Sequence, residues 1–172
     1  MEVISIGDFT AVVHNQGHGY AANRSTNTIH VFEQHADKWK RINSFSIDIT
    51  EGSFITLGIS NNLLYVCSIL DDRKDAYTLS GVFQFTTGKY GKEAPGELGG
   101  PRICNTDDSG AALIADYWND RLQVLGASGQ WNILQLDPSV KSPLGACLVN
   151  DTLYVGHQKE YGKWIISSYK SD

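Results

Sequence analysis

Short apolar segments separated by polar turns recur along the whole chain. Four stretches, residues 9–32, 54–77, 101–125 and 143–169, share one order of features. Each has an apolar strand, a turn rich in Asn, Asp and Gly, a second apolar strand, a polar loop and a third segment. Asn, Asp and Gly supply the local hydrogen bonds and positive φ angles of tight turns. No window shows the i, i+3, i+4, i+7 spacing of a helix, so the pattern predicts an all-β chain.

The spacing of the four stretches favours a repeat architecture. Equivalent places in the second strands, at separations of about 45, 48 and 41 residues, are taken by Tyr20, Tyr65, Leu113 and Tyr154. A period of about 40–50 residues with four short strands per unit is typical of β-propeller blades. The least clear fourth strands are expected at 40–47, 82–86 and 130–136. A β-sandwich is the structural alternative, but it would not require equivalent residues to recur at this period.

The third stretch carries the most specific motif. It reads GPRIC at 100–104, an Asp-Ser-Gly turn at 108–110, and IADYWNDRLQVL at 114–125, followed by Ser128-Gly129. This resembles the NHL repeat, in which an Ala-Asp pair precedes an Asn-x-Arg-Leu-Gln-Val segment. The other stretches are degenerate, because the place of Asp116 is taken by Asn23, Ser68 and His157. Thr28 also replaces the Arg of the motif in the first stretch, whereas Arg73 keeps it in the second.

The resemblance implies a single NHL-type β-propeller region over residues 1–172, with blades roughly at 1–48, 49–90, 91–137 and 138–172. NHL propellers usually close with six blades, so we expect a partial, open arc of about four. Open blade faces and sheet edges invite pairing, and self-association is therefore expected. The chain is similar in particular to the C-terminal region of invertebrate TRIM–NHL-like proteins. Their RING finger, B-boxes and coiled coil have no counterpart here, so any ubiquitin-ligase activity would reside in domains absent from this chain.

Composition and charge narrow the partners. Lys and Arg number 14 against 19 Asp and Glu, which gives a net charge of −5. This balance argues against broad nucleic-acid binding, which needs a positive surface. The N-terminus has no secretory signal pattern, and no apolar run is long enough for a membrane span. The scattered Cys67, Cys104 and Cys147 form no C-x-x-C pair, so we expect a reduced, cytoplasmic protein without a zinc site.

Three sets of residues could carry chemistry, and each is better explained by structure. Asp116, Asn119 and Arg121 are expected to fix their own loop, with Asp accepting backbone N–H bonds, Asn adopting turn geometry and Arg bridging to Asp. His14 and His18 have metal-ligand spacing only on a helix, and here they flank a turn. Cys104 and Cys147 are expected to be small, buried inner-strand residues. No catalytic residue, metal or cofactor is therefore predicted.

The loops between second and third strands are the best candidates for binding, because propellers carry them on one face. Two adjacent aromatic residues in such a loop suit either a binding patch or packing on a neighbouring blade. The candidate partner-binding residues are Arg102, Tyr117, Trp118, Asn119, Asp120, Asp71, Asp72 and Arg73. We expect a non-catalytic module that binds a protein partner, as in the substrate-recognition part of a TRIM-type ligase. The alternatives are an RNA-binding NHL module and a metal-dependent propeller hydrolase or lyase.

Overall fold

The computed structural model describes residues 8–170 and is built almost entirely of antiparallel sheets. Blade 1 contains β1 (Phe9–Asn15), β2 (His18–Asn23), β3 (Thr28–His35) and β4 (Lys38–Ser46). Blade 2 contains β5 (Ile55–Ser60), β6 (Leu63–Ser68), β7 (Arg73–Thr78) and β8 (Phe83–Thr87). Blade 3 contains β11 (Pro101–Thr106), β12 (Ala112–Asp116), β13 (Arg121–Leu125) and β14 (Trp131–Leu134). Blade 4 contains β15 (Lys141–Val149), β16 (Thr152–Glu160) and β17 (Lys163–Lys170).

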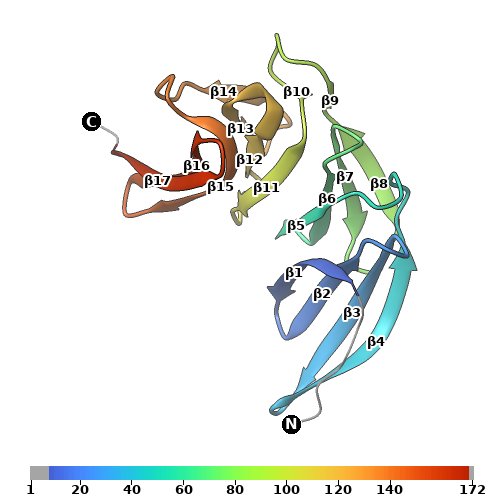
Figure 1. The fold of residues 1–172 in the computed structure, drawn as a ribbon. Coiled ribbons are helices and arrows are strands. Elements are labelled where there is room, and N and C mark those ends of the chain that lie inside the picture. Colours follow the sequence, from blue (N-terminus) through green and yellow to red (C-terminus); the bar gives the residue numbers. More distant parts are fainter. Residues whose placement is uncertain (1–7, 171–172) are drawn as a thin grey trace.

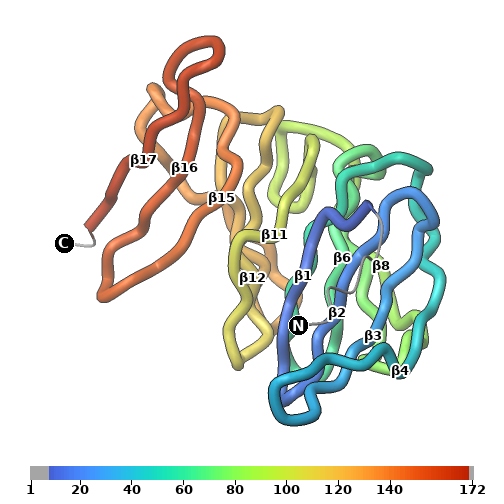
Figure 2. Tube along the Cα trace, turned by 60° about the horizontal axis from the view of Figure 1, so that its bottom comes forward, coloured from blue at the N-terminus to red at the C-terminus, as the bar shows by residue number. Residues whose placement is uncertain are grey.

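The four blades follow one another around an open arc, with the two chain ends at its opposite extremes (Figure 1). In every blade the strands are paired in sequence order. The first strands β1, β5, β11 and β15 contact their neighbours in turn and form the inner side of the arc. A second view shows the same succession of sheets (Figure 2). The prediction of an all-β, partial β-propeller is confirmed.

Apolar clusters between successive blades hold the arc together. Alternation along each strand sends one set of side chains to the preceding blade and the other set to the following blade. Tyr20 packs in a cluster shared with blade 2, Tyr65 in one shared with Ile103 of blade 3, and Leu113 in one shared with blade 4. The residues that revealed the repeat therefore lie on the same face of each blade. Their recurrence is explained by the packing of each blade on the next.

Tight turns connect the first two strands of blades 2 and 4. Asn61 and Asn62 have φ angles of 49° and 57°, and Asn150 and Asp151 have 46° and 60°. Positive φ at both central residues is the geometry of a type I′ hairpin turn, which Asn and Asp tolerate better than most residues. The predicted turns at these two places are confirmed.

One feature of the fold was not predicted. The connection from blade 2 to blade 3 contains a small parallel ribbon of β9 (Lys89–Tyr90) and β10 (Glu97–Leu98). Within residues 8–170 the helical structure is one short turn, η1 (Tyr117–Asn119). In that part of the chain there is no helix with the length and apolar character needed to cross a membrane.

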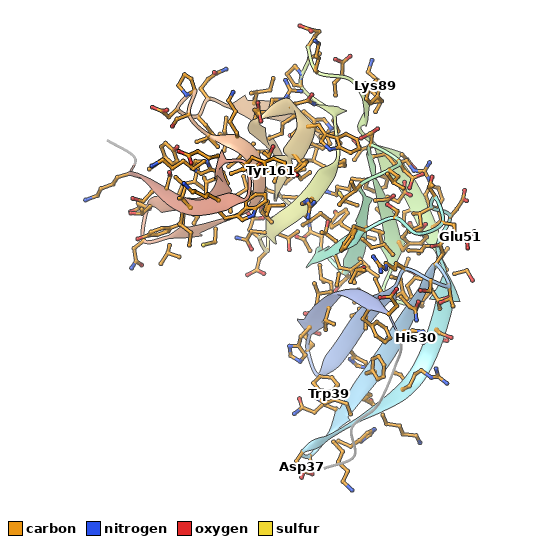
Figure 3. All side chains as sticks on the ribbon, viewed as in Figure 1. His30, Asp37, Trp39, Glu51, Lys89 and Tyr161 are labelled. Carbon is orange, nitrogen blue, oxygen red and sulfur yellow. The ribbon has the colours of Figure 1, made fainter. Side chains whose placement is uncertain are left out.

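The two end faces of the arc are apolar and uncovered. On blade 1, Val12 is 69% exposed and Trp39 lies beside it (Figure 3). On blade 4, Trp164 is 48% exposed and Ile166 75%. Cys147 lies on this face too, since it pairs across the sheet with Tyr154, and it is exposed. The expectation that Cys147 is buried was wrong, because no further blade covers its sheet.

Candidate functional site

The loop between the second and third strands of blade 3 is organised by a buried carboxylate. Asp116 is fully buried. Its oxygens accept hydrogen bonds from the Gly99 amide at 2.6 Å and from Nε of Arg121 at 2.7 Å. The side-chain amides of Asn119 and Gln123 each donate to it at 2.9 Å. A buried charge is tolerated when it is paired and fully hydrogen-bonded, and this carboxylate meets both conditions.

The partners of Asp116 also hold the connection that enters blade 3. Arg121 donates to the carbonyl oxygens of Lys92 at 2.9 Å and Glu97 at 2.8 Å. Asn119 donates to the carbonyl oxygen of Gly91 at 2.8 Å. The predicted Asp–Arg bridge is confirmed, and the cluster is structural. It ties residues 91–100 to the blade as well as ordering its own loop.

A second tie recurs in three blades, at the residue just before the third strand. Each such residue has a left-handed backbone, with φ of 48°, 50° and 54°. Its side chain bonds to backbone in the connection to the next blade or, in blade 3, in the first strand of the next blade. Asn27 donates to the carbonyl oxygen of Ile49 at 2.8 Å. Asp72 accepts a hydrogen bond from the Gly100 amide at 2.8 Å, and Asp120 accepts one from the Ser142 amide at 2.7 Å. The turn geometry expected of Asn119 therefore falls on Asp120, because Asn119 lies in η1.

Asp71 and Arg73 of blade 2 are engaged in the same way. Asp71 accepts hydrogen bonds from the amide of Thr50 at 3.1 Å and from its hydroxyl at 2.7 Å. Arg73 pairs with Asp75 at 3.1 Å and donates to the carbonyl oxygen of Asp48 at 2.6 Å. Both side chains fasten the connection from blade 1, so their polar groups are already bonded within the protein.

Three candidate residues are left for binding, and we call them the Arg102 patch: Arg102, Tyr117 and Trp118. The guanidinium of Arg102 lies 5.0 Å from the centre of the Tyr117 ring. Nε of Arg102 is buried without a hydrogen-bond partner in the described chain, and burial lowers the pKa of this guanidinium. Trp118 is 53% exposed. Its backbone amide donates to the carbonyl oxygen of Gly99 at 2.9 Å.

The Trp118 side chain packs against the backbone of Gly99 and Gly100. A Cβ placed on Gly100 would lie 3.1 Å from the Trp118 indole, so the ring lies flat against this connection. Tyr117 packs against Arg102 of its own blade, and Trp118 packs on the connection that enters this blade while 53% of it stays exposed.

The histidines do not gather into a metal site. The His14 ring stacks edge-on against Trp39 at 5.7 Å, and His18 lies 3.9 Å from Glu33. Among residues 8–170, no three His, Cys, Asp or Glu side chains come together to hold an ion. Cys67 is buried and Cys104 half-buried. Burial raises the pKa of the Cys67 thiol to about 12 and that of the Cys104 thiol to about 11. At neutral pH both are protonated and poorly nucleophilic.

A polar cleft on the inner side of the arc was not among the sequence candidates. It has a volume of about 380 Å³ and is lined by the inner strands of blades 1, 2 and 3. His14, Asn105 and Asp108 contribute its titratable and amide groups. The polar residues in and just after the predicted first strands were the only sequence signal for this cleft.

The comparisons with known proteins bear on the fold. Neither a protein-family model nor a curated protein sequence matches this chain. Among solved structures, a streptogramin B lyase matches with a TM-score of 0.66 and 18% identity, over 98% of this chain and 57% of its own. A protein of unknown function from Bacteroides thetaiotaomicron matches with a TM-score of 0.72 and 13% identity, over 94% of this chain and 47% of its own. A nidogen/laminin complex matches with a TM-score of 0.68 and 15% identity, over 92% and 64%.

These structures are β-propeller-like, and they include an enzyme as well as a protein complex. The chain spans less than two thirds of the length of each of them. Identities this low establish the shared fold and nothing about activity. Function must therefore be argued from the residues of this chain.

Proposed function

We propose that this chain is a non-catalytic β-propeller module that recognises a protein partner through the Arg102 patch on its loop face. The proposal is carried by the contrast between loop residues that are already hydrogen-bonded within the protein and those that are not. The side chains of Asn119, Asp120 and Asp72 are hydrogen-bonded to backbone groups of Gly91, Ser142 and Gly100. Arg102 is half-buried and its guanidinium donates no hydrogen bond within residues 8–170, while Trp118 is 53% exposed.

The composition of the patch suits protein recognition. Tyr, Trp and Arg are the residue types most enriched among those that dominate binding energy at interfaces. Trp118 is held flat on the Gly99–Gly100 backbone, so little side-chain freedom would be lost on binding. The Trp118 ring offers apolar area to a partner, and the guanidinium of Arg102 offers hydrogen-bond donors.

The finer parts of the proposal rest on the NHL-like motif at 114–125. Within a longer protein, the module would supply the substrate-recognition surface of a TRIM-type ubiquitin ligase in the cytoplasm. Ligase chemistry would then belong to other domains. RNA binding is the alternative for the same patch, since aromatic and Arg side chains also stack on bases. The net charge of −5 disfavours it.

A second candidate function is favoured by the polar cleft on the inner side of the arc. His14, Asn105 and Asp108 lie there, and a streptogramin B lyase shares the fold. This alternative predicts a metal-dependent hydrolase or lyase. Elemental analysis of the purified protein tests it: stoichiometric metal that is lost in His14→Ala would support an enzyme over a binding module.

The leading proposal is tested by selecting binders from a random peptide display library. We expect selected peptides to lose at least about tenfold in affinity for the double variant Tyr117→Ser/Trp118→Ser, a change of about 1.4 kcal/mol. Val82→Ser is the matched control, because Val82 is 59% exposed in the β7–β8 turn, away from the loop between β12 and β13. Peptides that bind both variants as well as the native chain would contradict the proposal. Binding of labelled single-stranded RNA that is lost with the patch would favour the RNA alternative.

A further inference from the structure

The second residue of the inner strand follows a pattern that blade 3 breaks. In blades 1 and 2 this residue is Thr10 and Thr56. The Thr10 hydroxyl accepts a hydrogen bond from the Ile55 amide at 3.4 Å, and that of Thr56 accepts one from Ile103 at 2.9 Å. Each threonine thus joins its blade to the inner strand of the next. In blade 3 the same place holds Arg102, which has no acceptor atom in its side chain and cannot make this bond.

The charge of Arg102 is also left uncompensated. The loop arginines of the three blades each pair with a carboxylate, Arg24 at 2.7 Å, Arg73 at 3.1 Å and Arg121 at 2.7 Å. Arg102 forms no ion pair and its guanidinium donates no hydrogen bond within residues 8–170. The Tyr117 ring lies 5.0 Å from the guanidinium, and no carboxylate of residues 8–170 pairs with Arg102. A half-buried cation without an anion is a costly arrangement for stability alone.

We propose that Arg102, which lies against the Tyr117 ring, is a carboxylate-binding subsite that takes an Asp or Glu side chain of an acidic peptide segment. A guanidinium presents parallel N–H donors that fit the two oxygens of a carboxylate. The residue beside that carboxylate in the peptide would rest on the exposed indole of Trp118. This inference rests on the proposed function, since it names the chemistry of the partner at the same patch.

The surroundings of the patch favour a peptide carboxylate over a nucleic-acid phosphate chain. A run of phosphates needs several cations along its path, because most of its affinity comes from neutralising successive charges. Among the other residues of the patch and its loop, Asp120 and Asp116 are acidic, and Arg121 is already paired with Asp116. Lys141 is paired with Asp120 at 3.2 Å. One isolated guanidinium beside one aromatic ring matches one carboxylate.

Two matched peptide libraries test the inference. Both have acetylated and amidated ends and randomised flanking positions, and they differ only in a fixed central Glu or Gln. Binding is measured by Trp fluorescence and by the NMR signal of the Arg102 Nε–H group, which Arg102→Lys identifies by its loss. We expect the Glu library to bind at least about tenfold more tightly than the Gln library. Arg102→Met should abolish this preference, and Arg102→Lys should retain only part of it.

Arg41→Met is the matched control, because it removes an exposed arginine of blade 1 and leaves the patch intact. Circular dichroism and thermal unfolding of each variant exclude misfolding as the cause of lost binding. Equal binding of the Glu and Gln libraries, or an unchanged preference in Arg102→Met, would overturn the inference. If peptides still required Trp118, the proposed function would survive that result. Tighter binding of a single-stranded RNA oligomer than of the Glu library would also overturn the inference.

Discussion

At the scale of single residues, the buried cation Lys74 is the feature with the clearest energetic consequence. Lys74 is fully buried between blades 2 and 3, where it pairs across the sheet with Cys67. Its amine lies 3.6 Å from the centre of the Tyr65 ring and has no hydrogen-bond partner within residues 8–170. Burial lowers the pKa of this amine to about 8. The loss of hydration therefore outweighs the attraction of the ring, which is on the order of 2 kcal/mol for a desolvated cation.

Lys74→Met is expected to stabilise the protein at pH 7 by about 1–3 kcal/mol, since it removes an unpaired buried charge and keeps the volume. The gain should depend on pH. Below pH 8 the amine is protonated in the folded and the unfolded chain, so the penalty is fully present. Between about 8 and the ordinary pKa of 10.5, the unfolded chain binds the proton that the folded chain has lost. Native stability then rises with pH, by up to about 1.4 kcal/mol per pH unit.

Urea unfolding of the native chain and of Lys74→Met at pH 7, 8 and 9 measures this effect. The advantage of the variant should shrink slightly between pH 7 and 8, and shrink further by about 1 kcal/mol between pH 8 and 9. The raised pKa of the Cys67 thiol acts in the opposite direction above pH 9, and comparing two proteins that share this thiol limits its influence. An advantage that grows with pH would show that the amine is not the titrating group.

At the scale of elements, the connections between blades are held by side chains from the strands they join. Residues 91–100 contain only the two-residue strand β10, yet Asp116, Asn119, Arg121 and Gln123 all bond to their backbone. Loops need their polar backbone groups satisfied, and here blade 3 supplies the partners. The residues of the NHL-like motif therefore hold this connection in place by hydrogen bonds. Trp118 of the Arg102 patch packs against Gly100 of the same connection.

Asp116→Ala is expected to cost about 3–5 kcal/mol of unfolding free energy. The substitution leaves Arg121, 13% exposed, without its carboxylate and removes the acceptor of the Gly99 amide. Hydrogen exchange should also become faster across residues 91–100, ahead of the rest of blade 3. Urea unfolding and exchange mass spectrometry measure the two effects. Asp137→Ala, an exposed turn substitution, should leave exchange in residues 91–100 unchanged, and equal effects of both variants would contradict this account.

At the scale of the whole molecule, the open arc leaves two blade faces that resemble the buried ones. Within the arc, the following face of each blade packs on the preceding face of the next. Blade 1 exposes a preceding face with Val12 and Trp39, and blade 4 exposes a following face with Trp164 and Ile166. These two faces are therefore of complementary kinds. Two copies of the 172-residue chain could bring them together head to tail.

We expect the isolated 172-residue chain to associate with itself as its concentration rises. Ile166→Asp should shift the midpoint of association to about tenfold higher concentration, because it places a charge in the apolar contact. Tyr161→Ser is the control, because this fully exposed residue lies in the turn between β16 and β17. Sedimentation velocity over a range of concentrations reports the midpoint. A chain that stays monomeric at the highest concentration would rule out this contact.

The sequence by itself determined the strands, the Asn-rich turns, the repeat period and the Asp116–Arg121 bridge. These features depend on local alternation, on positive φ angles and on residues five positions apart, which the chain order alone records. Only the tertiary structure decided which polar residues of the loops were already bonded. The sequence suggested Asp72 and Asp120 as binding residues, but their partners are Gly100, in the connection to blade 3, and Ser142, in the inner strand of blade 4. Burial also depended on the tertiary structure. Cys67 and Lys74 are buried because blade 3 covers their sheet, whereas Cys147 is exposed because no blade covers the outer face of blade 4.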